Sequence, residues 1–362
     1  YAKCDEEGFV TEVAEKKVIS KNATVGVYYW KRGSDYVSSA EEMIKKNIML
    51  ALKFLVSGGL IWFLIDGIDL GEAGERILNA NLLFLIVAFS LAILQIVVSV
   101  IRWRVVLEAI DGVLSFANCC RLYFVGTFFN QALPSAFGGD AVRIYRAYKE
   151  GLSLQCSING VMLERVATIL GLILLAIFVA PFFIDRVGSP NKIWILVILA
   201  GLGIFGVSGV FFLILLDRLP PKFFHSKFVR GLGHLAVDAR RVFLLPNNAF
   251  KAITWSLVGH MNIALVVFVL GISIGLEITW FDCMVLMPPV LLVLTLPISI
   301  AGWGVREQAM VAAFALVSVP GEGALALSIL FGLLGLLIGL PGGIVWLMSS
   351  DKKIININEL SD

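Results

Sequence analysis

Two segments far apart in the chain repeat one pattern of proline, glycine and arginine. Residues 134–143 read Pro-Ser-Ala-Phe-Gly-Gly-Asp-Ala-Val-Arg, and residues 297–306 read Pro-Ile-Ser-Ile-Ala-Gly-Trp-Gly-Val-Arg. Each segment follows a leucine and lies at the end of a long apolar run. Glycine and proline at membrane depth favour a broken helix, and each arginine supplies a fixed positive charge. A broken segment repeated in two halves of a membrane chain indicates the binding site of a transporter.

The ionisable residues around these repeats predict where an anion binds. They are Asp140, Arg143, Glu164, Arg165, Arg306 and Glu307. Gly139 and Gly302 are expected to let the backbone turn, so that the helices that follow direct N–H groups toward the substrate. Such a site suits an anionic head group, for example a lipid phosphate. The alternative is that these residues form ion pairs that hold the segments in place and touch no ligand.

The composition is that of an integral membrane protein. The chain is 59% hydrophobic and only 15% charged, with a mean hydropathy of +0.90, whereas soluble domains are about a quarter charged. The five cysteines form no C-x-x-C pair and there are three histidines, so we expect no disulfide framework, metal site or other cofactor. A net charge of +2 gives no reason to expect a nucleic-acid partner.

The apolar runs define the expected spans. Runs free of Asp, Glu, Lys and Arg after residue 48 are 54–65, 77–101, 122–139, 166–184, 193–216, 252–276, 283–305, 308–321 and 323–350. About 20 residues are needed to cross a bilayer as a helix. Runs 122–139 and 283–305 contain proline and glycine and are therefore expected to be broken or re-entrant. If Pro134 and Pro297 only kink full spans, the count of spans becomes eight.

The distribution of Lys and Arg predicts the orientation. Positive loops expected in the cytoplasm are 102–121, 140–150 and 217–251, together with the C-terminus. Loops expected outside are 66–76, 185–192, 277–282 and 320–323. The first broken segment then enters from the cytoplasm and the second from outside. We therefore predict two inverted halves, each with three spans and one re-entrant segment, and both chain termini in the cytoplasm.

Other polar residues are expected to be structural. His260 and Asn262, inside one apolar run, are typical of hydrogen bonds between membrane helices. The basic loop 217–251 is most simply the positive-inside signal, with a grip on anionic lipids as the alternative. The sequence contains none of the motifs G-x-S-x-G, G-x-x-x-x-G-K-[ST] and H-E-x-x-H, so we expect no catalytic residue in this chain.

The repeated motifs, with Glu164-Arg165 between them, resemble the membrane domain of the lysylphosphatidylglycerol synthase family over about residues 44–350. This resemblance implies a flippase that moves charged or lipid-linked head groups across the cell membrane. Some members of that family are fused to a cytosolic aminoacyl transferase, and archaeal relatives are associated with lipid-linked glycosyl transfer. Such a transferase domain has no counterpart among residues 351–362, which we expect to be a cytoplasmic tail.

Residues 1–47 differ in composition from the rest and predict a short α/β fragment. Two strands are expected at 8–16 and 23–30, followed by a helix from Ser34. The stretch from Glu15 is similar to the sugar-binding strand region of sugar nucleotidyltransferases, although a Gly-rich nucleotide loop is lacking. The predicted organisation is a truncated nucleotidyltransferase-like fragment at 1–47, a flippase-like membrane domain at 48–350 and the tail.

Three functions remain open on the sequence. The first is translocation of an anionic or lipid-linked substrate, with membrane lipids as partners. The second is a membrane subunit that serves a separate cytosolic glycosyl- or aminoacyl-transferase. The third is a purely structural membrane protein.

Overall fold

The structure is a computed structural model, and it falls into two units, Tyr1–Leu52 and Lys53–Asp362, which are described separately. The described residues are 2–4, 10–13, 55, 57–60, 62, 68–133, 138–184, 189–218, 227–295, 299 and 302–349.

The described part of the first unit is a pair of short strands. Strand β1 (Ala2–Cys4) pairs antiparallel with β2 (Val10–Val13). Strand β2 lies within the strand expected at 8–16, but its partner is β1, which the sequence did not indicate. The strand expected at 23–30 and the helix from Ser34 lie outside the described residues. The predicted α/β fragment is therefore not supported.

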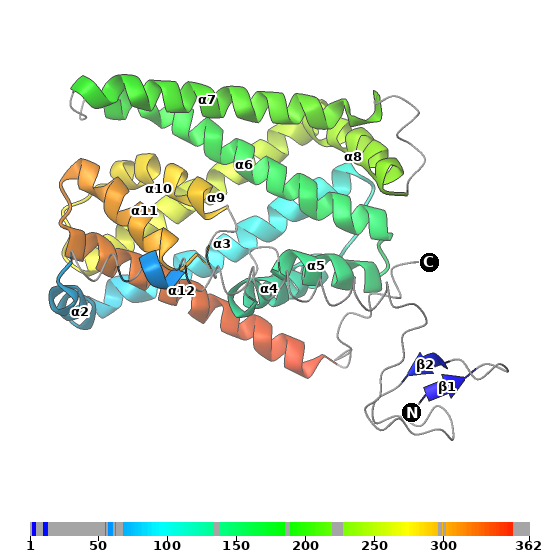
Figure 1. Cartoon of the computed structure of the whole chain (residues 1–362), viewed down its shortest axis with the longest axis horizontal. Coiled ribbons are helices and arrows are strands. Elements are labelled where there is room, and N and C mark those ends of the chain that lie inside the picture. Colours follow the sequence, from blue (N-terminus) through cyan, green and yellow to red (C-terminus); the bar gives the residue numbers. More distant parts are fainter. Residues whose placement is uncertain are drawn as a thin grey trace. The chain divides into compact units, whose positions relative to one another are not determined.

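The second unit is entirely helical in its described part (Figure 1). Its α-helices are α2 (Leu70–Leu78), α3 (Leu82–Ala109), α4 (Phe116–Ala132), α5 (Gly138–Lys149), α6 (Leu154–Ile184), α7 (Ser189–Ile214), α8 (Lys227–Phe243), α9 (Pro246–Ser273), α10 (Trp280–Leu294), α11 (Val305–Phe314) and α12 (Gly321–Met348). Two 3₁₀ turns, Leu216–Arg218 and Ala315–Val317, follow α7 and α11. The prediction of an all-α polytopic membrane protein is confirmed.

The order of helices repeats in the two halves. A short amphipathic helix is followed by a long helix, then by two shorter helices around a break, then by another long helix. These are α2, α3, α4–α5 and α6 in the first half, and α8, α9, α10–α11 and α12 in the second. The packing repeats as well, because α4 packs on α12 as α10 packs on α6.

The long helices α3 and α9, which correspond in the two halves, run in opposite directions. The backbone N–H of Asn81, before α3, donates to the carbonyl oxygen of Ser273, at the end of α9 (2.8 Å). Near the middle of the same pair, Asn262 Nδ2 donates to Gln95 Oε1 (3.0 Å). Helices α3 and α9 are therefore antiparallel neighbours, which is the relationship that an inverted repeat requires.

The first broken segment is a hairpin. Asn118, near the start of α4, donates through Nδ2 to Glu150 Oε2, just after α5 (3.0 Å), and Arg121 forms an ion pair with the same carboxylate. The outer ends of α4 and α5 therefore lie side by side. This is the geometry that a re-entrant segment requires, rather than that of a kinked span.

Polar caps set where several helices begin. Asn81 Oδ1 accepts from the N–H of Leu83, and Ser115 Oγ accepts from the N–H of Asn118 (3.0 and 3.2 Å). Thr279 and Asp282 form a reciprocal capping box at α10. Each cap satisfies N–H groups that the first turn of a helix leaves without partners.

Several expected loops are helical. Arg102 and Arg104 lie inside α3 rather than in a loop at 102–121, because a paired arginine does not end a helix. The expected loop 140–150 is mostly α5, loop 66–76 contains most of α2, and loop 217–251 contains α8. In these three cases the charged residues lie on short helices and not in loops.

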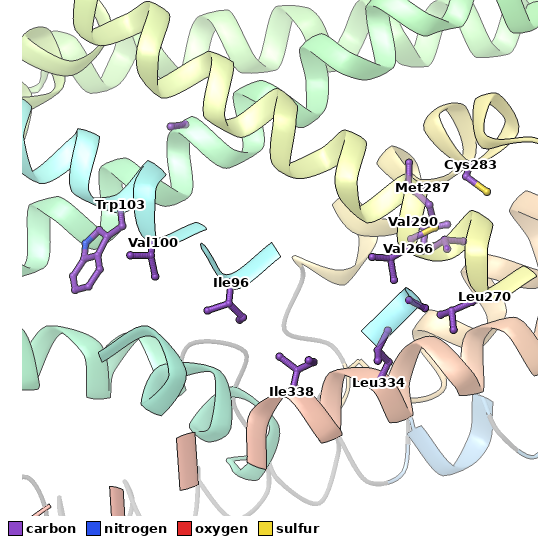
Figure 2. Packing of buried hydrophobic residues seen from close by; sticks show 14 of the residues in the cluster. Ile96, Val100, Trp103, Val266, Leu270, Cys283, Met287, Val290, Leu334 and Ile338 are labelled. Carbon is purple, nitrogen blue, oxygen red and sulfur yellow. The ribbon is translucent and has the colours of Figure 1, made fainter. Parts of the chain in front are cut away.

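Four described helices are long and apolar enough to cross a membrane. They are residues Leu82–Ala109, Leu154–Pro181, Pro246–Ser273 and Gly321–Met348. Their facing surfaces form a core in which Ile96 of α3 and Ile338 of α12 point toward one another (Figure 2). Met287 and Val290 of α10 lie beside Val266 of α9 in the same figure. This packing fixes the axes of the helices that carry the charged residues.

Candidate functional site

Five charged side chains from three helices form a chain of alternating sign. We call these residues the arginine chain: Arg102 of α3, Asp140 and Arg143 of α5, and Glu164 and Arg165 of α6. Glu164 accepts from Arg102 Nη2 on Oε1 (2.6 Å) and from Arg143 Nη2 on Oε2 (2.7 Å). Asp140 accepts from Arg143 Nη2 on Oδ1 (3.2 Å) and from Arg165 Nε on Oδ2 (2.7 Å).

The arginine chain carries one more positive than negative charge and is largely buried. The side chains of Arg102, Arg143 and Glu164 expose 5%, 4% and 2% of their surface. That of Arg165 exposes 43%. The arginine chain therefore runs from a buried end at Arg102 to an accessible end at Arg165, and charges at its buried end are screened poorly by their surroundings.

Two aromatic rings hold the guanidinium of Arg143. Its Cζ lies 4.8 Å from the ring centroid of Trp103 and 4.7 Å from that of Tyr123. A guanidinium over an aromatic face gains electrostatic attraction from the ring. Within the described part of the chain, the Nε of Arg143 and the Nε1 of Trp103 are both buried without a hydrogen-bond partner. Buried donors without a partner are rare in folded proteins, and a bound water, ion or ligand is one explanation for them.

Close helix packing positions Arg143. A Cβ added to Gly139 would lie 1.9 Å from the carbonyl oxygen of Gly126, so only glycine lets α5 approach α4 this closely. Asn130 Oδ1 accepts from the N–H of Gly139 (2.9 Å) and caps the start of α5. The expected role of Gly139 as a backbone turn is thus replaced by helix contact, since it lies within α5.

The second repeat forms a smaller cluster, which we call the Arg306 cluster: Arg306, Glu307 and Ser328. Arg306 Nη2 donates to Glu307 Oε1 (2.7 Å), and Ser328 Oγ donates to the same oxygen (3.2 Å). Arg306 Cζ also lies 4.5 Å from the ring centroid of Trp303. One arginine and one carboxylate cancel, so this cluster has no net charge.

Glycines of the second repeat act as the sequence predicts. Gly302 and Gly304 have φ angles of +82° and +84°, a region that side chains strongly disfavour. The N–H of Gly304 donates to Glu307 Oε2 (2.6 Å), so Glu307 both pairs with Arg306 and caps α11. Gly302 is therefore a true turn residue, unlike its counterpart Gly139.

Among the described residues no hydrogen bond or ion pair joins the arginine chain to the Arg306 cluster. In the second half, α9 contains no Asp, Glu, Lys or Arg after Lys251, and α12 contains none after Glu322. The second half therefore lacks the charges that extend the chain in the first half.

Four residues that belong to these clusters or contact them were not identified from sequence. Arg102 was assigned to a loop, and Trp103, Tyr123 and Ser328 had no motif to mark them. For Arg102 and Trp103, the only signal in the sequence is that an arginine adjoins a tryptophan at the end of an apolar run. The expected helix–helix hydrogen bonds are present: His260 Nε2 lies 2.9 Å from the carbonyl oxygen of Thr168, and Asn262 bonds Gln95.

Comparison with known families agrees with this architecture. Residues 50–343 match the family model described as the lysylphosphatidylglycerol synthase TM region. The chain belongs to this family. A family member in Methanocaldococcus jannaschii, a UPF0104 membrane protein, is 28% identical over 145 residues, which cover 40% of this chain and 42% of that protein. A UPF0104 membrane protein of Methanothermobacter thermautotrophicus is 28% identical over 109 residues, or 30% and 31% of the two chains. Each match thus spans less than half of the relative.

Proposed function

We propose that this membrane protein moves a lipid with an anionic head group across the bilayer, and that the arginine chain binds the head group. The observation that carries the proposal is the excess arginine together with two buried, unused donors, Arg143 Nε and Trp103 Nε1. An unbalanced charge at membrane depth is unfavourable by roughly 2.5–3.5 kcal/mol on insertion scales. An anion would offset that cost and complete the hydrogen bonds.

Phosphate chemistry suits these donors. Arginine binds phosphate through a planar fork of N–H groups, often with two parallel hydrogen bonds. Arg165, with 43% of its side chain exposed, is the accessible end at which an anion would first meet the chain. The antiparallel halves support a rocking motion around the site, as in other transporters built from inverted repeats.

Lipid movement in reconstituted vesicles tests the proposal. The purified protein is placed in vesicles that contain a fluorescent phosphatidylglycerol. An impermeant reagent added outside bleaches the fluorophores in the outer leaflet, so the further loss of fluorescence reports lipids that have crossed from the inner leaflet. We expect Arg143→Gln to slow crossing about tenfold or more, since a hydrogen bond to a charged group contributes about 1.5–3 kcal/mol. Arg143→Lys should also be impaired because a point charge does not replace the fork.

The control is Arg104→Gln, which changes an arginine that is 36% exposed and pairs with Glu108 on the surface of α3. Normal crossing with Arg143→Gln would overturn the proposal. The description of the family favours a second candidate, the membrane part of a lipid-directed transferase system. In that case the protein alone would show no crossing, and a separate transferase would be required for activity.

A further inference from the structure

An apolar groove lies between α6, α9 and α10, and no residue of either charged cluster lines it. It has a volume of about 570 Å³, and the described side chains that line it are all apolar. These are five residues of α6 between Leu174 and Val179, Leu257 and Met261 of α9, and Phe281 and Met284 of α10. The volume falls in the range of roughly 300–1,000 Å³ that is typical of ligand sites.

The groove has a buried floor and exposed walls. Leu175 and Val179 expose only 5% and 3% of their surface, whereas Leu174 and Phe178 expose 44% and 73%. It therefore opens on one side. Helices α6 and α9 are both long and apolar enough to cross a membrane, and within a bilayer an opening between them would face hydrocarbon rather than water.

We infer that this groove holds a hydrocarbon chain of the transported lipid while its head group occupies the arginine chain. This inference rests on the proposed function and adds a second part to the site. Its occupant must be apolar, because a polar group in the groove would find no hydrogen-bond partner among the lining side chains. Met261 and Met284 are unbranched and flexible, which suits a chain of variable length and unsaturation.

The distance between the two parts matches a lipid. Glu164 and Leu174 lie on the same helix, and a rise of 1.5 Å per residue separates them by roughly 15 Å. The hydrocarbon core of a bilayer is about 30 Å thick, so the acyl chain of a lipid in one leaflet extends over about half of this thickness. A lipid whose phosphate contacts Arg143 can therefore place one chain in the groove.

Photo-cross-linking tests the inference on the full chain in nanodiscs. The probe is phosphatidylglycerol with a diazirine near the end of one acyl chain, and cross-linked peptides are mapped by mass spectrometry. We expect labelling at Leu174–Val179, Met261 and Met284. Leu174→Trp and Met284→Trp, tested singly and together, should fill the groove and abolish this labelling. The matched control is Leu337→Trp on α12, where the residue is 51% exposed outside the groove.

The outcomes separate this inference from the proposed function. Groove labelling that is lost in Arg143→Gln supports both. Groove labelling that persists in Arg143→Gln supports the groove as a site for the acyl chain. It counts against the arginine chain as the site for the head group. Equal labelling of the groove and the exposed face of α12 overturns the inference, as does labelling that survives both tryptophan variants. A dimer that covers the groove with a second copy overturns it too.

Discussion

The guanidinium of Arg143 and the carboxylate of Glu164 meet at 2.7 Å, with 4% and 2% of their side chains exposed. Arg143 lies on α5 of the first hairpin and Glu164 on the following long helix. The pair thus fastens the hairpin to a candidate membrane span. Because Glu164 also binds Arg102 of α3, one carboxylate joins three helices. Charge balance within this group therefore affects both the fold and the proposed substrate site.

Removing the charge of Glu164 should destabilise the protein. In Glu164→Gln, Arg102 and Arg143 lose their shared counter-charge while they stay buried, and breaking a buried pair in this way typically removes about 3–5 kcal/mol of stability. We expect a clear fall in the thermal unfolding midpoint in detergent. Glu108→Gln is the control, since Glu108 is 57% exposed in its pair with Arg104 and such pairs contribute about 1 kcal/mol or less. Equal midpoints for the two variants would contradict this role of Glu164.

A methyl group at Gly342 should disturb the contact between α12 and α4. Its Cβ would lie 1.9 Å from the carbonyl oxygen of Phe124, and backbone cannot move aside as a side chain can. Gly342→Ala should therefore lower the unfolding midpoint, with a loss on the order of 1–3 kcal/mol. Gly209→Ala on α7 should be neutral or stabilising by up to about 1 kcal/mol, because nothing lies within 4 Å of the added group and alanine favours helix. Equal tolerance of both changes would show that the helices can separate.

The Arg306 cluster should behave as a structural pair. Arg306→Gln leaves Glu307 buried without its counter-charge, so we expect lower thermal stability and reduced lipid crossing. Arg306→Gln combined with Glu307→Gln restores neutrality and should recover much of both, since replacing a whole buried pair is often tolerated. This contrasts with the sequence-based hypothesis that Arg306 contacts substrate. If the double variant folded like the native protein yet moved no lipid, Arg306 would belong to the binding site.

The ends of the first hairpin and the loop before α9 should face the cytoplasm. Residues 140–150, at the end of the hairpin, and residues 217–251, which surround this loop, each carry an excess of Lys and Arg, which favours that side. In a cysteine-free background, Glu150→Cys and Asn247→Cys should be protected from an impermeant thiol reagent in right-side-out vesicles. Glu277→Cys should be labelled, as a control for the outer side. Labelling of position 150 without position 247 would show that the first broken segment crosses the membrane.

Hydrophobicity explains how much of the fold could be predicted from the sequence. A run without charges that is long enough to cross hydrocarbon must be helical, because its backbone groups have no other partners there. Four of the expected spans, and the breaks near Gly139 and Gly302, follow from this rule. It fails for Arg102, because a charged residue whose partner lies on another helix continues a span instead of ending it.

The sequence by itself determined that two related halves carry an arginine behind a broken apolar segment. Only the tertiary structure decided that these arginines differ: Arg143 lies in a chain with excess positive charge, whereas Arg306 is neutralised by its neighbour Glu307. The sequence names the charged residues but not the angles at which helices cross. Because α3, α5 and α6 meet around Glu164, and α9 and α12 carry no such charges in the interior of their helices, helix packing is what makes the surroundings of the two arginines differ.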